Sequence, residues 1–161
     1  MNSLDKFDCA LLAALQADAT LSISGLSDKV GLSSTPCWKR VKRLEDEGYI
    51  ESRVTIVNRQ KVGLPVTVFV SVRTAEHDEK WLERFAAAVV ALPEVLEFHR
   101  MSGDVDYLLK VATTDIAGYD RFYKKLIKTA QLSGVSSAFS MEQIKCTTAL
   151  PLELIAHGLA A

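Results

Sequence analysis

Residues 30–44, VGLSSTPCWKRVKRL, contain the clearest structural signal in the chain. Gly31 suits the left-handed conformation in which helices often end, and Ser33 or Ser34 can cap a following helix. Pro36 fits the first turn of that helix, where a missing N–H costs little. Two helices joined by such a short turn containing glycine are typical of a helix-turn-helix. We therefore predict this motif here.

The helix that begins near residue 34 has an apolar face and a basic face. Cys37, Val41 and Leu44 lie within about 60° of one another on a helical wheel, which directs them toward a core. The basic face is most simply a solvated one, but after a tight glycine turn it also suits the major groove of DNA. The wheel places Lys39, Lys42 and Arg43 farthest from the apolar face. We predict that double-stranded DNA is bound by Ser34, Thr35, Trp38, Lys39, Arg40, Lys42 and Arg43.

Two helices are expected before residue 31, and the second of them is the first helix of this motif. Asp5 can cap a first helix and Ser22 a second one, and both segments carry apolar residues at helical spacing. Residues 54–57, VTIV, are rich in β-branched side chains and predict a short strand that extends the domain as a wing. Residues 1–57 thus predict a winged helix-turn-helix DNA-binding domain.

The rest of the chain predicts a second domain, so that the protein as a whole is α+β. A polar segment, residues 58–65, is the expected linker. Valines alternate with other side chains over residues 66–73, which is typical of a strand. Residues 66–153 form the expected domain, and residues 154–161 form a tail. The elements of the domain follow in the order strand, helix, strand, strand, helix, strand, which is the order of a ferredoxin-like βαββαβ fold. Their expected ranges are 66–73, 78–92, 95–101, 107–112, 115–130 and 135–145.

Such a sheet carries helices on one face and leaves the other face open. An open face with apolar side chains predicts self-association. Either the alternating valines from Val66 to Val72 or Phe69 with its neighbours are expected to meet a second subunit. A two-fold symmetric dimer is the commonest arrangement.

Composition excludes several classes of protein. The 161 residues hold 19 basic and 20 acidic side chains, a net charge of −1 that argues against a histone-like coat on DNA. No apolar run approaches the roughly 18 residues of a membrane-spanning helix, and Asp5 and Asp8 interrupt the region where a signal peptide would lie. We therefore expect a cytoplasmic protein with no membrane partner.

Candidate catalytic chemistry is also missing from the sequence. It shows no activated nucleophile, no cluster with metal-ligand spacing and no glycine-rich phosphate loop. We expect no enzymatic activity, no metal site and no cofactor.

Five blocks of sequence resemble the Lrp/AsnC family, the feast/famine transcriptional regulators of bacteria and archaea. In the family's order they are ALQ (14–16), VGLS (30–33), TPCWKRVKRLE (35–45), SGDVDYLL (102–109) and MEQIK (141–145). The resemblance implies an N-terminal DNA-binding domain and a C-terminal, RAM-type domain that binds an amino-acid effector. It also implies dimers that assemble into tetramers or octamers, and control of amino-acid metabolism genes. The sequence of residues 37–40 and 141–145 most resembles that of a proteobacterial branch associated with cysteine detoxification.

The resemblance also implies an effector site. In the family, the loop that corresponds to residues 102–106 lines an amino-acid pocket. Gly103 lets backbone N–H groups approach a ligand carboxylate, and the Asp106 carboxylate suits a ligand ammonium. The expected effector is a small amino acid, with cysteine and a leucine-like amino acid as candidates. The expected site consists of Arg100, Met101, Gly103, Asp104, Asp106, Tyr107, Ile116, Ala138, Phe139 and Ser140.

Two alternatives stay open at this point. An architectural protein that compacts DNA without responding to a ligand would carry the same basic helix. The three cysteines, Cys9, Cys37 and Cys146, lie outside any CxxC pattern and are expected to be reduced thiols. Burial as small apolar groups and redox sensing are the two interpretations of these cysteines.

Overall fold

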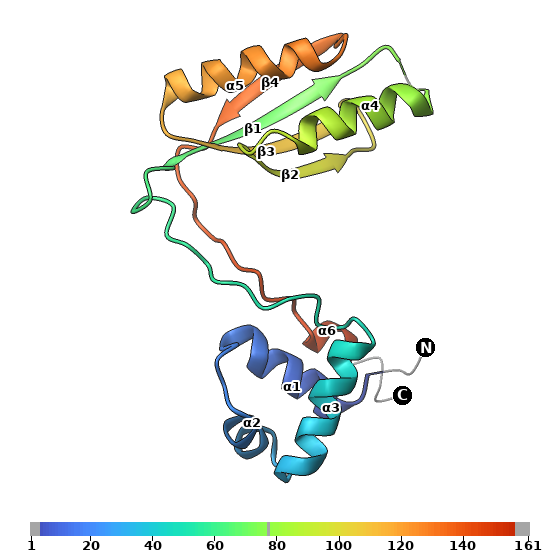
Figure 1. Cartoon of the computed structure of the whole chain (residues 1–161), viewed down its shortest axis with the longest axis vertical. Coiled ribbons are helices and arrows are strands. Elements are labelled where there is room, and N and C mark those ends of the chain that lie inside the picture. Colours follow the sequence, from blue (N-terminus) through green and yellow to red (C-terminus); the bar gives the residue numbers. More distant parts are fainter. Residues whose placement is uncertain (1–3, 77, 157–161) are drawn as a thin grey trace. The chain divides into compact units, whose positions relative to one another are not determined.

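The computed structural model describes residues 4–76 and 78–156, which divide between two units (Figure 1). The first unit comprises residues 1–55 together with residues 145–161, and the second comprises residues 56–144. The segment from residue 145 onward thus groups with the first unit, although the sequence places it in the second domain as far as residue 153. Residues 157–161 of the predicted tail lie outside the described residues.

Three helices form the N-terminal part of the first unit; side chains cap the first two, whereas Ser33 stands at the N-cap of the third without a side-chain cap hydrogen bond. Helix α1 is Lys6–Ala17, α2 is Ile23–Val30 and α3 is Ser34–Asp46. Asp5 and Asp8 form a reciprocal capping box at α1, and the Ser22 side chain accepts a hydrogen bond from the backbone of Gly25 at α2. Gly31 ends α2 in the left-handed conformation, with φ of 69°. The predicted helix-turn-helix, α2 and α3, is confirmed.

The apolar faces of these helices meet in one core. Leu11, Leu26, Cys37 and Leu44 are almost completely excluded from solvent, as the helical wheel of α3 predicts. Burial raises the pKa of the Cys37 thiol, and burial followed by the nearby carboxylates raises that of Cys9. These two cysteines therefore behave as small apolar groups, whereas Cys146 is exposed.

The C-terminal segment joins this unit through a specific contact. The Gln16 side chain on α1 donates a hydrogen bond to the carbonyl of Leu150 at 3.2 Å and accepts one from its backbone N–H at 2.7 Å. Leu152 packs against the helical core, and the short helix α6, Glu153–Ala156, follows it. Apolar packing and a paired amide thus explain why residues beyond 145 belong to the first unit.

The second unit is a four-stranded antiparallel sheet with two helices on one face (Figure 1). The strands are β1 (Val66–Arg73), β2 (Val95–Arg100), β3 (Tyr107–Thr113) and β4 (Gly134–Phe139), in the spatial order β2-β3-β1-β4. The helices are α4 (Glu79–Val90) and α5 (Ile116–Thr129), capped by Asp78 and Asp115. This is the predicted βαββαβ order.

The alternation along β1 separates the two faces of the sheet. Val68, Val70 and Val72 are fully buried beneath α4 and α5, together with Phe85 and Phe122. The other face carries Thr67, Phe69 and Ser71 of β1, with Phe69 39% exposed. Of the two rows considered for self-association, the structure therefore leaves the one with Phe69 accessible.

Two predicted strands differ from the structure. Residues 54–57 have no strand partner in the described part of the chain, so the predicted wing strand is wrong. The last strand ends at Phe139, six residues before the predicted end at residue 145. After Ser140, whose N–H donates to the Thr67 carbonyl at 2.9 Å, the chain leaves the edge of β1. The β-branched residues 54–57 favour extended backbone, but a strand there, as after Ser140, also needs a neighbour for its backbone hydrogen bonds.

Two glycines of the helix-turn-helix give opposite predictions for substitution by alanine. A Cβ on Gly25, inside α2, would lie 3.6 Å from the Leu21 side chain, an ordinary contact. Gly25→Ala should therefore raise the free energy of unfolding by about 0.5–1 kcal/mol, because alanine is the better helix former. Gly31→Ala should lower it by a similar amount or more, since φ of 69° strains any residue with a Cβ. Urea unfolding of both variants measures the change in the free energy of unfolding relative to wild type. Changes of the same sign in the two variants would contradict the assigned helix boundary.

Candidate functional site

A buried carboxylate on α1 binds two arginines of α3. Asp8 is only 1% exposed. Its Oδ1 accepts a hydrogen bond from Arg40 Nη1 at 2.8 Å, and its Oδ2 lies 2.7 Å from Arg43 Nη2. Arg40 also reaches Asp5 Oδ2 at 2.7 Å, and its guanidinium lies 5.6 Å from the centre of the Phe7 ring. A carboxylate removed from water needs such cationic partners, so these contacts fix α3 against α1.

The pKa values of these groups reflect the same contacts. Hydrogen bonding to Asp5 and then to Asp8 raises the pKa of Arg40, and the hydrogen bond to Asp8 raises that of Arg43. Burial raises the pKa of Asp5, but the backbone N–H of Asp8 and the guanidinium of Arg40 lower it more, so that it lies below its ordinary value of 3.8. The ion pairs thus favour the charged form of Asp5 and of both arginines.

This network engages two of the predicted DNA-binding residues in contacts within the domain. The helical wheel places Arg43 farthest from the core, but its guanidinium bends back to Asp8 and also lies 3.4 Å from Glu47. Arg40, expected at the boundary of the face, is likewise engaged. A wheel records where a Cβ points, whereas an arginine side chain is long enough to reach a buried acid beside it.

The remaining predicted residues share one exposed face of α3. They form two rows of neighbours three or four residues apart, 34–38–42 and 35–39–42, which lie side by side on a helix. Lys39 forms no ion pair with any described residue, and Lys42 binds only the exposed Asp46, at 2.7 Å. Trp38 is 53% exposed. The face consists of Ser34, Thr35, Trp38, Lys39 and Lys42.

A second group of predicted residues lies at the turn between β2 and β3. Gly103 adopts φ of 113°, a conformation that strains other residues. The Asp106 carboxylate accepts a hydrogen bond from the Thr74 backbone N–H at 2.8 Å, and the Asp106 N–H donates to the Val72 carbonyl at 3.0 Å. Arg73 Nε donates to the carbonyl of Asp104 at 2.7 Å. The turn is therefore tied to the C-terminal end of β1.

Two other members of the predicted effector site flank this turn. The Met101 N–H donates to the Asp106 carbonyl at 2.8 Å, and Arg100 pairs with Tyr107 across β2 and β3. Tyr107 is only 4% exposed and packs against the rings of Phe85 and Phe98. Its ring therefore belongs to the core, because its position in β3 faces the helices, although the sequence analysis includes Tyr107 in the effector site.

The other predicted effector residues lie at the opposite end of the sheet. They are Ile116, Ala138, Phe139 and Ser140. Phe139 is paired with Val68, whereas Tyr107 is paired with Val72. Since a strand rises about 3.3 Å per residue, the two groups are separated by well over 10 Å along β1. One subunit does not bring them together.

No described helix is long and apolar enough to span a membrane. Within the described residues there is also no group of three or more histidine, cysteine or carboxylate side chains placed to hold a metal ion.

Comparison with known proteins connects these features to a family. A family model for the Lrp/AsnC ligand binding domain matches residues 67–150, and one for a winged helix-turn-helix DNA-binding domain matches residues 4–51. The chain belongs to the Lrp/AsnC family. It is therefore a transcriptional regulator that combines a DNA-binding domain with a ligand-binding domain. The second unit contains most of the matched ligand-binding region.

Relatives align over nearly the whole chain. The chain is 49% identical over 152 residues to the glutamate uptake regulatory protein of Zymomonas mobilis, covering 94% of this chain and 93% of that protein. It is 50% identical over 151 residues to the DNA-binding transcriptional activator DecR of Escherichia coli, covering 93% and 99%.

Solved structures show the same fold. An AsnC family transcriptional regulator from Agrobacterium tumefaciens superposes with a TM-score of 0.92 at 53% identity, covering 94% of this chain and 99% of that one. A transcriptional regulator from Neisseria meningitidis in complex with L-Met superposes with a TM-score of 0.90 at 34% identity, covering 95% and 99%.

The sequence analysis missed the role of Asp8. Asp5 and Asp8 are spaced for a capping box, and that interpretation accounts for them completely within α1. The matching spacing of Arg40 and Arg43, three residues apart on α3, is the only signal in the sequence that pairs the two helices. Recognising it requires knowing that α1 and α3 pack side by side.

The lowered pKa of Asp5 predicts a pH-dependent contribution to stability. This contribution is present above the ordinary pKa of 3.8 and is lost as the pH falls through the lower folded-state value. Asp5→Asn should keep the helix cap but remove the charge, so its deficit in unfolding free energy should be largest near neutral pH and shrink below about pH 4. Urea unfolding across this range measures the difference from wild type, and a constant difference would contradict the assigned ion pair.

Proposed function

We propose that the exposed face of α3 reads operator DNA and that a small amino acid bound near the β2–β3 turn controls this activity. The observation that carries the proposal is the division of α3 into two functions. Arg40 and Arg43 hold the helix in place, while Lys39 and Lys42 remain accessible on its outer side. In a helix-turn-helix, the second helix enters the major groove, which fits the exposure of this face.

The proposed DNA contacts follow from side-chain chemistry. Lys39 and Lys42 supply charge for phosphates, and Ser34 and Thr35 supply hydroxyls at the N-terminal end of α3 for phosphates or base edges. Trp38 presents a large apolar surface beside them. In a two-fold dimer, two such helices would read half-sites about 34 Å apart, or a multiple of that spacing.

The proposed effector site requires more than one subunit. Gly103 and its neighbours expose backbone N–H groups for a ligand carboxylate, and Asp106 supplies a negative charge for its ammonium. Ile116 and residues 138–140 lie too far along the sheet to complete this site within the same chain. A second copy that presents its own residues 138–140 to the β2–β3 turn would complete it.

Self-association through the open face of the sheet provides that second copy. Phe69 lies on this face opposite Lys110 of β3 and Ala138 of β4, and Leu108 lies two positions from Lys110 along β3. A dimer would cover these side chains, and further assembly into tetramers or octamers follows the pattern that the resemblance implies. An amino acid bound between subunits would then favour one assembly over another.

The effector is proposed to be a small amino acid, with cysteine and a leucine-like amino acid as the candidates. The Neisseria relative was solved with L-Met, a side chain of similar size to leucine. The resemblance of residues 37–40 and 141–145 is the ground for placing the protein in the branch associated with cysteine detoxification. We place the protein in the cytoplasm, where it would control genes of amino-acid metabolism.

Removing a single lysine tests the DNA-binding face. Lys39→Ala should weaken operator binding and reduce the slope of log K against log salt concentration by about one, because one phosphate contact is lost. Lys128→Ala, on the exposed side of α5, makes the same charge change outside the face and should leave both quantities close to wild type. Fluorescence anisotropy with labelled operator DNA over a range of salt concentrations measures them. An equal effect of the two substitutions would show that α3 is not the reading helix.

Removing the charge of Asp106 tests the effector site. Asp106→Asn can still accept the hydrogen bond from Thr74, so the turn should stay folded while the ammonium partner is lost. We expect the amino-acid response of DNA binding to weaken by at least about tenfold in effector concentration, with ligand-free DNA affinity nearly unchanged. Glu83→Gln, an exposed charge removal on α4, is the control.

Titration of each variant with L-cysteine and L-leucine in the DNA-binding assay gives the comparison. An unchanged response of Asp106→Asn would rule out this site. Absence of any amino-acid response in the wild-type protein would instead favour an architectural role.

A further inference from the structure

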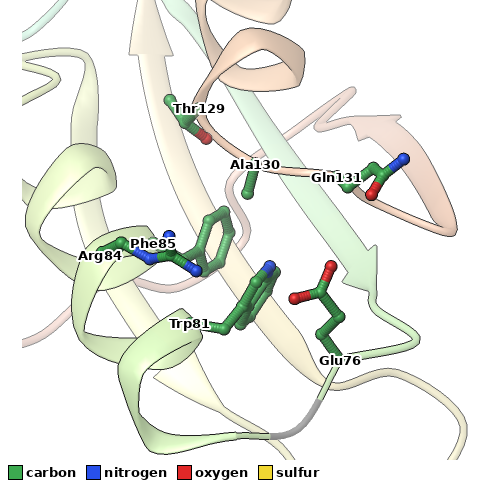
Figure 2. A pocket seen from close by; sticks show the side chains of 7 residues that line it. All are labelled: Glu76, Trp81, Arg84, Phe85, Thr129, Ala130 and Gln131. Carbon is green, nitrogen blue, oxygen red and sulfur yellow. The ribbon is translucent and has the colours of Figure 1, made fainter.

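A cavity of about 220 Å³ lies within the second unit, between the first turn of α4 and the end of α5 (Figure 2). Two aromatic rings, Trp81 and Phe85, form part of its wall, and Ala130 and Gln131 close it from the end of α5. None of its lining residues belongs to the effector site proposed between subunits, so the two sites are separate. Its volume is sufficient for a molecule of the size of an amino acid.

The cavity contains an unpartnered hydrogen-bond donor. Trp81 is only 4% exposed, and its Nε1–H has no hydrogen-bond partner among the described residues. Figure 2 shows this nitrogen on the side of the ring that is directed toward Glu76 and the segment 129–131. A buried N–H without an acceptor is costly, and most native structures avoid it. A ligand with an acceptor oxygen would remove that cost.

The lining also carries two opposite charges that no described residue neutralises. Glu76 is half-buried, and its carboxylate forms no ion pair in the described part of the chain. Arg84 is exposed at the rim of the cavity; its Nε donates to the Lys80 carbonyl at 3.3 Å, and its two terminal nitrogens have no described partner and face solvent. A ligand with one positive and one negative group would complement both charges.

We propose that this cavity binds a small zwitterion, an α-amino acid with an apolar side chain. Its carboxylate would accept hydrogen bonds from Trp81 Nε1–H and the Arg84 guanidinium, and its ammonium would pair with Glu76. The apolar side chain would lie against Phe85 and Ala130. The choice of an amino acid as the ligand rests on the proposed function, whereas the location of the binding site rests on the lining of the cavity.

Packing connects the cavity to the β2–β3 turn. The Trp81 ring stacks on Phe85 with centroids 4.9 Å apart, and it lies 6.2 Å from the ring of Tyr107. Tyr107 directly follows Asp106, whose carboxylate binds the turn to β1. Occupation of the cavity would therefore constrain the residue next to the proposed effector site, which makes the cavity a second place where an amino acid acts on the same domain.

Tryptophan fluorescence reports directly on this cavity. The chain has two tryptophans, so Trp38→Phe leaves Trp81 as the only one. Titration of this variant with L-cysteine, L-leucine and L-methionine, without DNA, should give a saturable change in Trp81 emission for at least one of them. The N-acetyl and methyl-ester derivatives of that amino acid lack the ammonium charge and the carboxylate charge, respectively, and each should bind at least about tenfold more weakly.

Substitutions in the same background assign the binding to the cavity. Glu76→Gln and Arg84→Gln should each weaken binding by at least about tenfold, whereas Glu83→Gln, beside Arg84 but outside the lining, should have no effect. If the Asp106→Asn variant still shows the saturable change in Trp81 emission, the amino acid binds in the cavity, whether or not the proposed site at the β2–β3 turn exists. The proposal is overturned if none of the three amino acids changes Trp81 emission, if Glu76→Gln and Arg84→Gln bind as tightly as their parent, or if Asp106→Asn alone abolishes the signal.

Discussion

The DNA-binding unit depends on one buried carboxylate. Asp8 sits almost completely out of water, which is tolerable only because Arg40 and Arg43 reach it from α3. The same acid caps α1 through the N–H of Asp5, so one side chain fixes both the start of the first helix and the seat of the third. Arg40 and Arg43 are thus held in ion pairs within the domain, and under the proposed function Lys39 and Lys42 on the outer face of α3 supply the charge for DNA.

The second unit meets a different constraint, since β1 must serve two surfaces at once. Its alternate valines fill the core beneath α4 and α5, and the residues between them, such as Phe69, form the open face. A shift of register by one residue would exchange these two sets. Pairing with β3 on one side and β4 on the other fixes the register, and with it the open face and the position of the β2–β3 turn.

Local patterns allowed most of the fold to be predicted from the sequence. The caps at Asp5 and Ser22, the left-handed Gly31 and the alternation of β1 all depend on neighbouring residues, and the structure confirms them. The absence of a strand over residues 54–57, the contact of Gln16 with Leu150 and the ion pairs of Asp8 depend on residues distant in sequence. For the same reason the residues on the exposed face of α3 could be predicted from their positions, but the ion pair of Arg43 with Asp8 could not.

A double-mutant cycle between Asp8 and Arg43 is the most direct test of how α3 is held. The free energies of unfolding in urea are compared for wild type, Asp8→Asn, Arg43→Gln and the double variant. If the buried ion pair fixes α3 on α1, the two substitutions should be coupled by about 1–3 kcal/mol, so that the double variant is much less destabilised than the sum of the single ones. Additive effects, with a coupling of no more than a few tenths of a kcal/mol, would contradict this arrangement.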